Sequence, residues 1–399
     1  MILTLLLDLD DTLLNTNMDA FVPAYFQALS KHLSSRVSPQ SMLPALMSGT
    51  QLMLASEDPS RTLQDVFEAE FYPKIGVPKG ELAETIDDFY DNIFPTLSHV
   101  TKKREGAREL VEWALAKNYR VAIATDPLFP RKATYHRVRW AGLDPERFAL
   151  ISSFETFHFS KSHPAYFAEV LGRLGWPDGP VLMVGNDVER DLLPAQKLGL
   201  ATYHIEDAPA SNPGSDADRR GNLIDLRSWL ESTDLAALEP SYKSIDSILA
   251  VMASTPGILQ SLISRLNRAE LSHQPAPEDW ALIEVLCHLR DTEREIHRLQ
   301  LDALLSGVNP FVPRPDGAVW AKERKYLDED GAAALNEFTS ARIEMLDRLK
   351  SLDRNIWTRK ARHAIFGPTS FMEVIGFMAE HDRMHVQQAW NIINPLYSG

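Results

Sequence analysis

Apolar and polar positions follow three successive patterns along the chain. An apolar run from Ile2 to Leu7 predicts a strand that is buried on both faces, as in a parallel sheet. Residues 18–100 have an irregular helical pattern, with amphipathic pieces at 20–33, 63–72 and 81–93. Strand and helix patterns then alternate, with strands expected at 120–125, 148–152, 181–185 and 201–205, and helices at 107–117, 164–174, 192–198 and 223–230.

This order predicts an α/β domain over residues 1–232, built on a doubly wound, Rossmann-like parallel sheet. A helical insertion of about residues 16–100 interrupts the sheet after its first strand, residues 207–221 are expected to form a loop, and a linker is expected at 233–242. Beyond the linker the strand signals vanish, and four long helical patterns remain at 245–266, 280–305, 331–352 and 371–393. They predict an all-α, up-and-down four-helix bundle over residues 243–399.

Charge and cysteine content narrow the possible partners. The chain has 41 Lys and Arg against 55 Asp and Glu, a formal charge of −14, which argues against a broad basic surface for nucleic acid or anionic membrane. The single cysteine, Cys287, excludes an intrachain disulfide and fits a reducing compartment. The first apolar run is too short for a signal peptide, and no later run is expected to approach membrane-spanning length. We therefore expect a cytoplasmic protein that binds neither nucleic acid nor membrane.

Two carboxylates follow the first predicted strand. Asp8 and Asp10 stand at its carboxyl end, where open α/β sheets place their chemistry. Residues i and i+2 of an extended segment project to the same side, so both carboxylates are expected to approach one reacting group. Because two close carboxylates repel each other, the pair also suggests a divalent cation such as Mg²⁺. An acidic turn without chemistry remains the alternative for these residues alone.

Three further signals lie at the ends of later strands. Thr125 follows an apolar strand and could hold an anion together with nearby backbone amides. Lys161 offers a point charge that could neutralise a phosphate or a carboxylate. The strand from residue 181 runs into Gly185-Asn186-Asp187-Val188-Glu189-Arg190-Asp191, which adds Asp187 and Asp191 to the same edge. Taken singly, Thr125 is more often a turn residue, Lys161 more often a solvated charge, and Gly-Asn-Asp more often an ordinary turn.

The order of these signals resembles the four-motif set of the haloacid dehalogenase superfamily over about residues 1–232: Asp-x-Asp-x-Thr, a strand ending in Thr, Lys, and Gly-Asn-Asp-x-x-x-Asp. The resemblance implies that Asp8 attacks phosphorus and forms an aspartyl-phosphate, while Asp10 protonates the leaving oxygen and then activates water. It implies that Thr125 and Lys161 hold the phosphoryl oxygens. Mg²⁺ would be bound by Asp8, the carbonyl of Asp10, and Asp187, with Asp191 as a ligand or a neighbour of the ligands.

The same resemblance favours one branch of the superfamily. A carboxylate at Asp10 favours phosphatase or phosphomutase chemistry, since displacing a halide needs no protonated leaving group. The insertion resembles the helical cap that closes over the site and selects the substrate. Many relatives have Pro directly after the lysine, whereas here Pro164 comes three positions after Lys161. The expectation is a Mg²⁺-dependent phosphatase acting on small phosphorylated metabolites, with a phosphomutase as the alternative.

The C-terminal helices contain a separate histidine pattern. His381 and His385 are one turn apart on one predicted helix face, and His288 lies in an apolar stretch of another helix that should face the bundle core. Together with Trp280, the Phe366-Gly367-Pro368-Thr369-Ser370 segment and the His-Asp-Arg-x-His-x-x-Gln sequence, this pattern resembles the DinB-like (YfiT-like) metal-binding bundles over about residues 243–397. The resemblance implies a divalent transition metal, Zn²⁺, Ni²⁺ or Fe²⁺, held by the three histidines with open positions for water or substrate.

Several interpretations of the bundle stay open at this stage. Asp291 or Glu380 is expected to support the metal ligands. The resemblance allows a metal-dependent thiol S-transferase, a binding module, or a domain that only mediates self-association as a homodimer. Cys287 is expected to be a packed hydrophobe rather than a nucleophile, because adjacent helical residues point about 100° apart, so Cys287 and His288 diverge.

Overall fold

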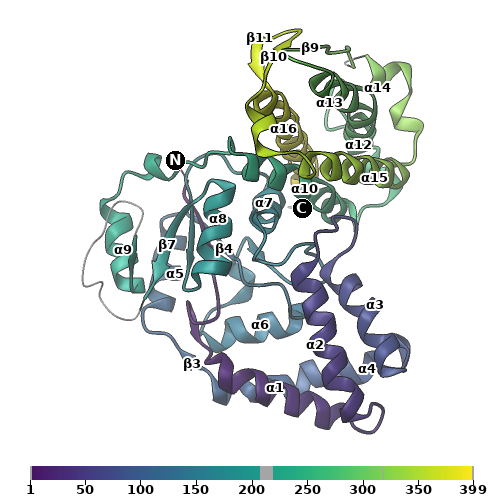
Figure 1. Cartoon of the computed structure of the whole chain (residues 1–399). Helices are drawn as coiled ribbons and strands as arrows, with labels where there is room; N and C mark the ends of the chain where they lie inside the picture. Colours follow the sequence, from purple (N-terminus) through teal and green to yellow (C-terminus); the bar gives the residue numbers. More distant parts are fainter. Residues whose placement is uncertain (1, 207–218, 318, 398–399) are drawn as a thin grey trace. The chain divides into compact units, whose positions relative to one another are not determined.

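The computed structural model describes residues 2–206, 219–317 and 319–397 (Figure 1). The chain divides into two compact units. The first comprises Met1–Glu57, Arg61–Val170 and Pro177–Ser241, and the second comprises Asp58–Ser60, Leu171–Trp176 and Tyr242–Gly399. Most of the predicted loop at 207–221 lies outside the described residues.

A six-stranded sheet forms the centre of the first unit. Its order is β5-β4-β1-β6-β7-β8, and every neighbouring pair is parallel. The strands are β1 (Thr4–Leu7), β4 (Arg120–Ile123), β5 (Leu150–Ile151), β6 (Val181–Gly185), β7 (Ala201–Ile205) and β8 (Arg220–Gly221). The apolar first strand is central, because Leu7 pairs with Ile123 on one side and with Val184 on the other. The predicted doubly wound parallel sheet is confirmed, and β1 ends at its switch point, where ligands bind in such sheets.

Helices flank this sheet and build its core. Leu5 and Leu7 of β1 are fully buried and pack in one hydrophobic cluster with side chains of α5 (Ala107–Ala116) and α9 (Leu223–Ser232). The remaining helical elements between the strands are α6 (Arg131–Trp140), η3 (Pro145–Arg147), α7 (Pro164–Arg173), η4 (Val188–Leu192) and α8 (Leu193–Leu198), and η5 (Leu235–Leu238) follows α9.

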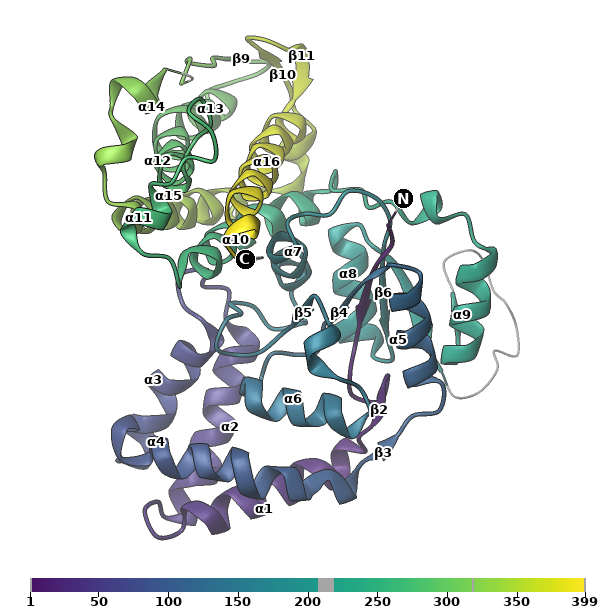
Figure 2. The ribbon, with the colours of Figure 1, turned by 180° about the vertical axis from the view of Figure 1, so that it is seen from behind.

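A helical insertion leaves the sheet after β1 through a two-stranded ribbon. β2 (Leu14–Asn15) pairs antiparallel with β3 (Lys102–Lys103), and the helical residues lie between them, gathered together in Figure 2. The elements are α1 (Met18–Leu33), α2 (Pro39–Ala55), α3 (Leu63–Ile75), α4 (Lys79–Asp88), η1 (Phe89–Ile93) and η2 (Phe94–Val100). They share a core of their own around Phe21, Phe89 and Phe94. α2 was not among the expected helical pieces because Pro44 and scattered apolar residues obscure its periodicity.

The second unit is predominantly helical. Its long segments are α10 (Ile245–Ile263), the run of α12 (Leu282–Asp291), η6 (Thr292–His297) and α13 (Arg298–Leu305), α15 (Gly331–Lys350) and α16 (Phe371–Tyr397). Short pieces are α11 (Arg268–Leu271), α14 (Trp320–Glu323), η7 (Tyr326–Asp328) and η8 (Arg354–Thr358). Contrary to the sequence expectation, one helix of the described residues, α10, is long and apolar enough to cross a membrane. Of the apolar stretch of this helix, 67% is buried inside the protein, as in the core helix of a globular domain.

The expectation that the bundle contains no strands was wrong. β10 (Lys360–His363) pairs antiparallel with β11 (Gly367–Ser370) and parallel with β9 (Phe311–Val312). These strands are too short to show a period in the sequence, and β10 carries Lys and Arg at its outward positions. Gly367 adopts a φ of 71°, which glycine tolerates and which closes the hairpin. The small sheet places His363 in the bundle interior, where it is 4% exposed.

Candidate active site and metal centre

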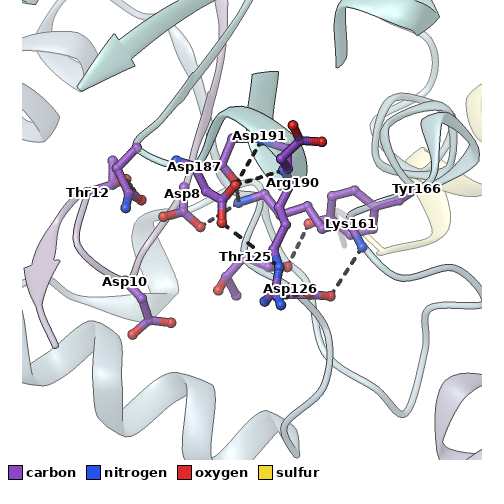
Figure 3. Close-up of polar contacts among 12 residues, drawn as sticks. Asp8, Asp10, Thr12, Thr125, Asp126, Lys161, Tyr166, Asp187, Arg190 and Asp191 are labelled. Carbon is purple, nitrogen blue, oxygen red and sulfur yellow. Dashed lines mark hydrogen bonds and ion pairs between the residues drawn. The ribbon is translucent and has the colours of Figure 1, made fainter. Parts of the chain in front are cut away.

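Three buried charges from the segments that follow β1, β5 and β6 meet at the carboxyl edge of the large sheet. The Lys161 Nζ lies 2.5 Å from Asp8 Oδ1 and 2.6 Å from Asp191 Oδ1 (Figure 3). Asp8 directly follows β1, and its N–H donates to the Val184 carbonyl of β6 at 2.9 Å, which fixes its backbone. All three residues are at least 94% buried. The structure therefore brings Asp8, Lys161 and Asp191 into one cluster, as expected.

Burial and mutual charge set the protonation of this cluster. Burial raises the pKa of Asp191 to about 7, and the negative charge of Asp8 adds to the rise while Lys161 opposes it. Burial alone would lower the pKa of Lys161, but Asp191 and Asp8 hold it above its ordinary value. One lysine thus faces two carboxylates. With both carboxylates ionised, the cluster has an excess negative charge on hard oxygen ligands, which suits Mg²⁺.

The segment after β6 adds the remaining acidic residue. The Asp187 carboxylate accepts from the backbone N–H groups of Glu189 and Arg190, and its own N–H donates to Asp191 Oδ2 at 3.0 Å. The side chain of Asp187 is 45% exposed, so it can rotate toward a ligand without opening a void in the protein interior. Gly185 matters for this geometry, because a Cβ there would lie 2.1 Å from Asp191 Oδ2.

Thr125 lies at the end of the neighbouring strand and is 2% exposed. Its carbonyl accepts hydrogen bonds from Ser152 Oγ at 2.6 Å and from Tyr166 OH at 2.8 Å. These bonds fix the backbone that presents its hydroxyl. Asp126, which follows it, accepts from the Lys161 backbone N–H at 3.2 Å and so connects the ends of two strands.

Asp10 differs from the sequence expectation. Its carboxylate pairs with Arg137 of α6 and accepts from Thr16 Oγ1 at 2.6 Å, and in Figure 3 it lies apart from the Asp8 cluster. The rule that residues i and i+2 share a side holds only for extended strand. β1 ends at Leu7, so Asp10 already belongs to the turn. Sequence reasoning missed Arg137, which is 1% exposed and follows no motif.

The three predicted histidines of the second unit converge. His381 Nε2 lies 3.1 Å from the Nε2 atoms of both His288 and His385, and the candidate ligand atoms of the three residues lie within 4.8 Å of one another. A single proton on His381 Nε2 can serve only one of these two contacts. A cation shared by the three lone pairs would satisfy all of them, so this arrangement fits a metal ion.

Burial keeps these imidazoles neutral, which is the form that binds metals. It lowers the pKa of His288 to about 3 and that of His381 well below its ordinary value, with the neighbouring histidines adding to both shifts. The pKa of His385 is lowered by burial as well. His385 Nδ1 contacts Gln388 Oε1 at 2.9 Å, which orients this ring, whereas the Nδ1 atoms of His288 and His381 have no hydrogen-bond partner among the described residues.

The expected supporting carboxylates have other partners. Asp291 accepts from Arg324 at 2.6 Å and from Tyr326 at 2.7 Å, and Glu380 pairs with Arg383 at 2.7 Å. The expectation that either of them supports the ligands is therefore not met by the contacts of the structure.

A different buried network adjoins the histidines. Asp382, the residue after His381, pairs with Arg342, and Arg342 also bonds both oxygens of Glu293 at 2.7 and 2.8 Å. Glu293 in turn lies 2.8 Å from His297 Nδ1, and the His297 and His381 rings are 5.5 Å apart. Sequence reasoning missed this chain of contacts because its members lie on three helices with no shared spacing.

A cavity of about 500 Å³ opens next to the three histidines. Its lining includes Trp280, His297, Arg314, His363 and Phe377 in addition to the three. This volume lies within the range of small-molecule sites, so the cluster is accessible to a ligand of that size.

Two families match successive parts of the chain. Residues 2–199 match the haloacid dehalogenase-like hydrolase family, and residues 252–389 match the DinB superfamily. No curated protein matches the chain.

Among solved structures, the chain is similar to YfnB from Bacillus subtilis, described as a putative HAD-hydrolase bound to magnesium, at 23% identity over 58% of this chain and 99% of that one, with a TM-score of 0.37. It is similar to a HAD phosphatase from Thermococcus onnurineus, at 19% identity over 58% and 98% of the two chains, with a TM-score of 0.37. It is also similar to YfiT from Bacillus subtilis, described as a probable metal-dependent hydrolase with an unusual four-helix bundle topology, at 16% identity over 39% and 89%, with a TM-score of 0.35. The chain thus joins a haloacid dehalogenase-like hydrolase domain to a DinB superfamily domain.

Proposed function

We propose that the N-terminal domain is a Mg²⁺-dependent phosphatase for small phosphorylated metabolites. The observation that carries this proposal is the contact of Lys161 with both Asp8 and Asp191 at the switch point of the sheet. Asp8 Oδ1 is occupied by the lysine, which leaves Oδ2 as the oxygen that attacks phosphorus. Asp8, the carbonyl of Asp10, Asp187 and Asp191 would hold Mg²⁺, which when bound neutralises charge on the phosphoryl group.

The proposed reaction has two displacements at phosphorus. In the first, Asp8 Oδ2 forms a bond to phosphorus as the bond to the leaving oxygen breaks, and Asp10 gives its proton to that oxygen. In the second, water attacks the aspartyl-phosphate, Asp10 takes a proton from the water, and inorganic phosphate leaves with Asp8 regenerated. Lys161 and the Thr125 hydroxyl hold the phosphoryl oxygens throughout.

This assignment requires the Asp10 carboxylate to leave Arg137 and Thr16 when substrate binds. Both contacts lie next to the ribbon through which the helical insertion joins the sheet, since Thr16 directly follows β2. A movement of the insertion would therefore change the surroundings of Asp10, as expected for a cap that closes over a substrate.

The first test is turnover of p-nitrophenyl phosphate with and without Mg²⁺. Asp8→Asn should abolish phosphate release, because the amide is a poor nucleophile. Asp144→Asn is a matched control: Asp144 caps η3 by accepting from Glu146 N–H, which an Asn oxygen can also do, and it precedes β5 at the opposite edge of the sheet. Activity that survives Asp8→Asn, or that is unaffected by removal of Mg²⁺, would contradict the proposal.

The proton-transfer role of Asp10 has its own test. Asp10→Asn should slow hydrolysis of an alkyl phosphate by about 10²- to 10⁴-fold, the usual contribution of a positioned acid. p-Nitrophenolate leaves without a proton. In a single turnover of p-nitrophenyl phosphate, Asp10→Asn should therefore slow formation of the aspartyl-phosphate much less than it does for the alkyl phosphate. Equal losses for both esters would show that Asp10 does not act as the acid. A sugar phosphate panel scored for isomerised product, and not only for phosphate, would identify the phosphomutase alternative.

We further propose that the C-terminal domain binds a divalent transition metal and performs a reaction on it, with thiol S-transfer as the candidate. The convergence of the Nε2 atoms of His288, His381 and His385 favours this second function. Metal content after dialysis against Zn²⁺ tests it. His381→Ala should lower the content by about one ion per chain, whereas His273→Ala, at an exposed position of the same domain, should not. Unchanged content in His381→Ala would exclude the site.

A further inference from the structure

The cavity beside the three histidines has a charged side and an apolar side. Arg314 lines it together with His288 and His363, and the charge of this residue adds to burial in lowering the pKa of both rings. Among the carboxylates of the lining, Glu380 is paired with Arg383, and Asp316 lies in the same segment as Arg314.

His363 supplies a hydrogen-bond donor on the same side. Its Nδ1 accepts from the backbone N–H groups of Ile365 at 3.2 Å and Phe366 at 3.3 Å. Because Nδ1 is the acceptor, the neutral ring carries its proton on Nε2. Nε2–H is then the group that His363 offers to a ligand in the cavity.

The apolar side is formed mainly by α16 and the hairpin before it. Phe366 and Phe377 are in ring contact at 4.4 Å, and they are 58% and 40% exposed although both are large aromatic residues. Phe366 also stacks on His363 at 4.9 Å. Val374 and Met378 continue this side of the cavity toward the histidines. An aromatic or alkyl group placed here would cover side chains that are otherwise in water.

A metal held by three neutral imidazoles keeps its full positive charge. In the proposed site none of the ligands is a carboxylate, so the ion adds two positive charges to the lining that already has Arg314. Asp316 and Glu380 also line the cavity, so with the ion and Arg314 the lining carries one net positive charge. This favours a negatively charged ligand, and the apolar side selects one with a hydrophobic group.

We propose that this cavity binds a small amphipathic carboxylate, with its carboxylate between Arg314 and His363 and its aromatic or alkyl group against Phe366 and Phe377. The apolar group continues toward the histidines, so the position next to the metal is left for the reacting part of the ligand. The positive charge of the ion in this inference rests on the proposed metal site. The contacts with the carboxylate and with the apolar group rest on Arg314, His363 and the two phenylalanines alone.

The test compares 3-phenylpropanoate with its neutral analogue 3-phenylpropan-1-ol, by calorimetric titration of the full chain loaded with Zn²⁺. We expect the carboxylate to bind about tenfold or more tightly than the alcohol, the size of one charge-assisted hydrogen bond. Arg314→Gln, at an exposed position, should remove most of this preference and leave the affinity for the alcohol unchanged. Arg348→Gln, at a half-exposed arginine of α15 that is not in the lining, is the matched control and should change neither affinity.

Phe377→Ala should weaken both ligands together, because it removes the apolar contact without changing the charge. Equal affinity of the wild-type chain for carboxylate and alcohol, or a preference that survives Arg314→Gln, would overturn the proposal. Metal content is measured on the same samples. If the chain holds no Zn²⁺, the metal proposal fails by that measurement, and the cavity proposal is judged by the Arg314→Gln comparison on the metal-free chain.

Discussion

Arg342 is the residue whose loss should cost the C-terminal domain most. It is fully buried and pairs with Glu293 and Asp382, which are 1% and 0% exposed. Burial alone would raise the pKa of Glu293, yet the charge and hydrogen bonds of Arg342, with a smaller contribution from His297, lower it from 4.5 to about 2. At 1.36 kcal/mol per pKa unit, this shift corresponds to about 3 kcal/mol of stability at neutral pH. Arg342→Met also leaves two buried carboxylates without a cation, so the expected loss is about 3 to 5 kcal/mol.

Hydrogen exchange of α15 peptides across a urea series measures this loss in the C-terminal domain alone. Arg348→Met is the control on the same helix: its ion pair with Asp302 is 39% and 54% exposed, and an exposed pair of this kind contributes less than about 1 kcal/mol. Converting Glu293 to Gln and Asp382 to Asn in the Arg342→Met background should recover part of the stability. Equal losses for Arg342→Met and Arg348→Met would refute the reasoning, as would a double conversion that destabilises further.

Three other predictions follow from single contacts. The pKa of His288 is about 3 in the folded chain and 6.5 when unfolded, so between these values the unfolded state binds more protons and the metal-free C-terminal domain should lose stability as the pH falls from about 6.5 to 3, measurable by urea unfolding. Gly185→Ala places a methyl group against Asp191, and it should destabilise the N-terminal domain by about 1 to 3 kcal/mol and lower its phosphatase activity. Burial raises the pKa of the Cys287 thiol to about 12, so a thiol reagent at pH 7 should modify it only after unfolding.

The parts of the fold that sequence predicted are those with a strong local period. β1 and β6 are buried along their whole length, so nearly all of their residues are apolar and both strands are easy to recognise in the sequence. β9 and β10 escaped notice because two and four residues cannot establish a period and because β10 has charged outward positions. Because β10 was not predicted, the position of His363 in the lining of the cavity was not predicted either.

The site residues divide in a similar way. Asp8 was predictable because it directly follows a recognisable strand. Lys161 and Asp191 were predicted from the order of the motifs, which resembles that of the haloacid dehalogenase superfamily, and the structure brings them to Asp8. Arg137 and Arg342 were not predictable. Each is a buried arginine inside a helix, and the carboxylates with which it pairs lie at least 40 residues away in the sequence. A charged residue in a helical pattern predicts a solvated position unless its distant partners are known.

Asp10 shows how a correct motif can give an incorrect geometry. The motif places two carboxylates at positions i and i+2, and the inference that they face one reacting group assumed that the strand continues through both. The structure ends β1 at Leu7 and bonds Asp10 to Arg137 and Thr16, beside the ribbon of the helical insertion. A carboxylate stabilised there cannot also donate a proton at Asp8. If Asp10 is the acid, its release from Arg137 must precede the first displacement, so Arg137→Met should change the rate of aspartyl-phosphate formation while Asp144→Asn leaves it unchanged. An unchanged rate in Arg137→Met would mean that Asp10 does not move during turnover and that the leaving group takes its proton from water.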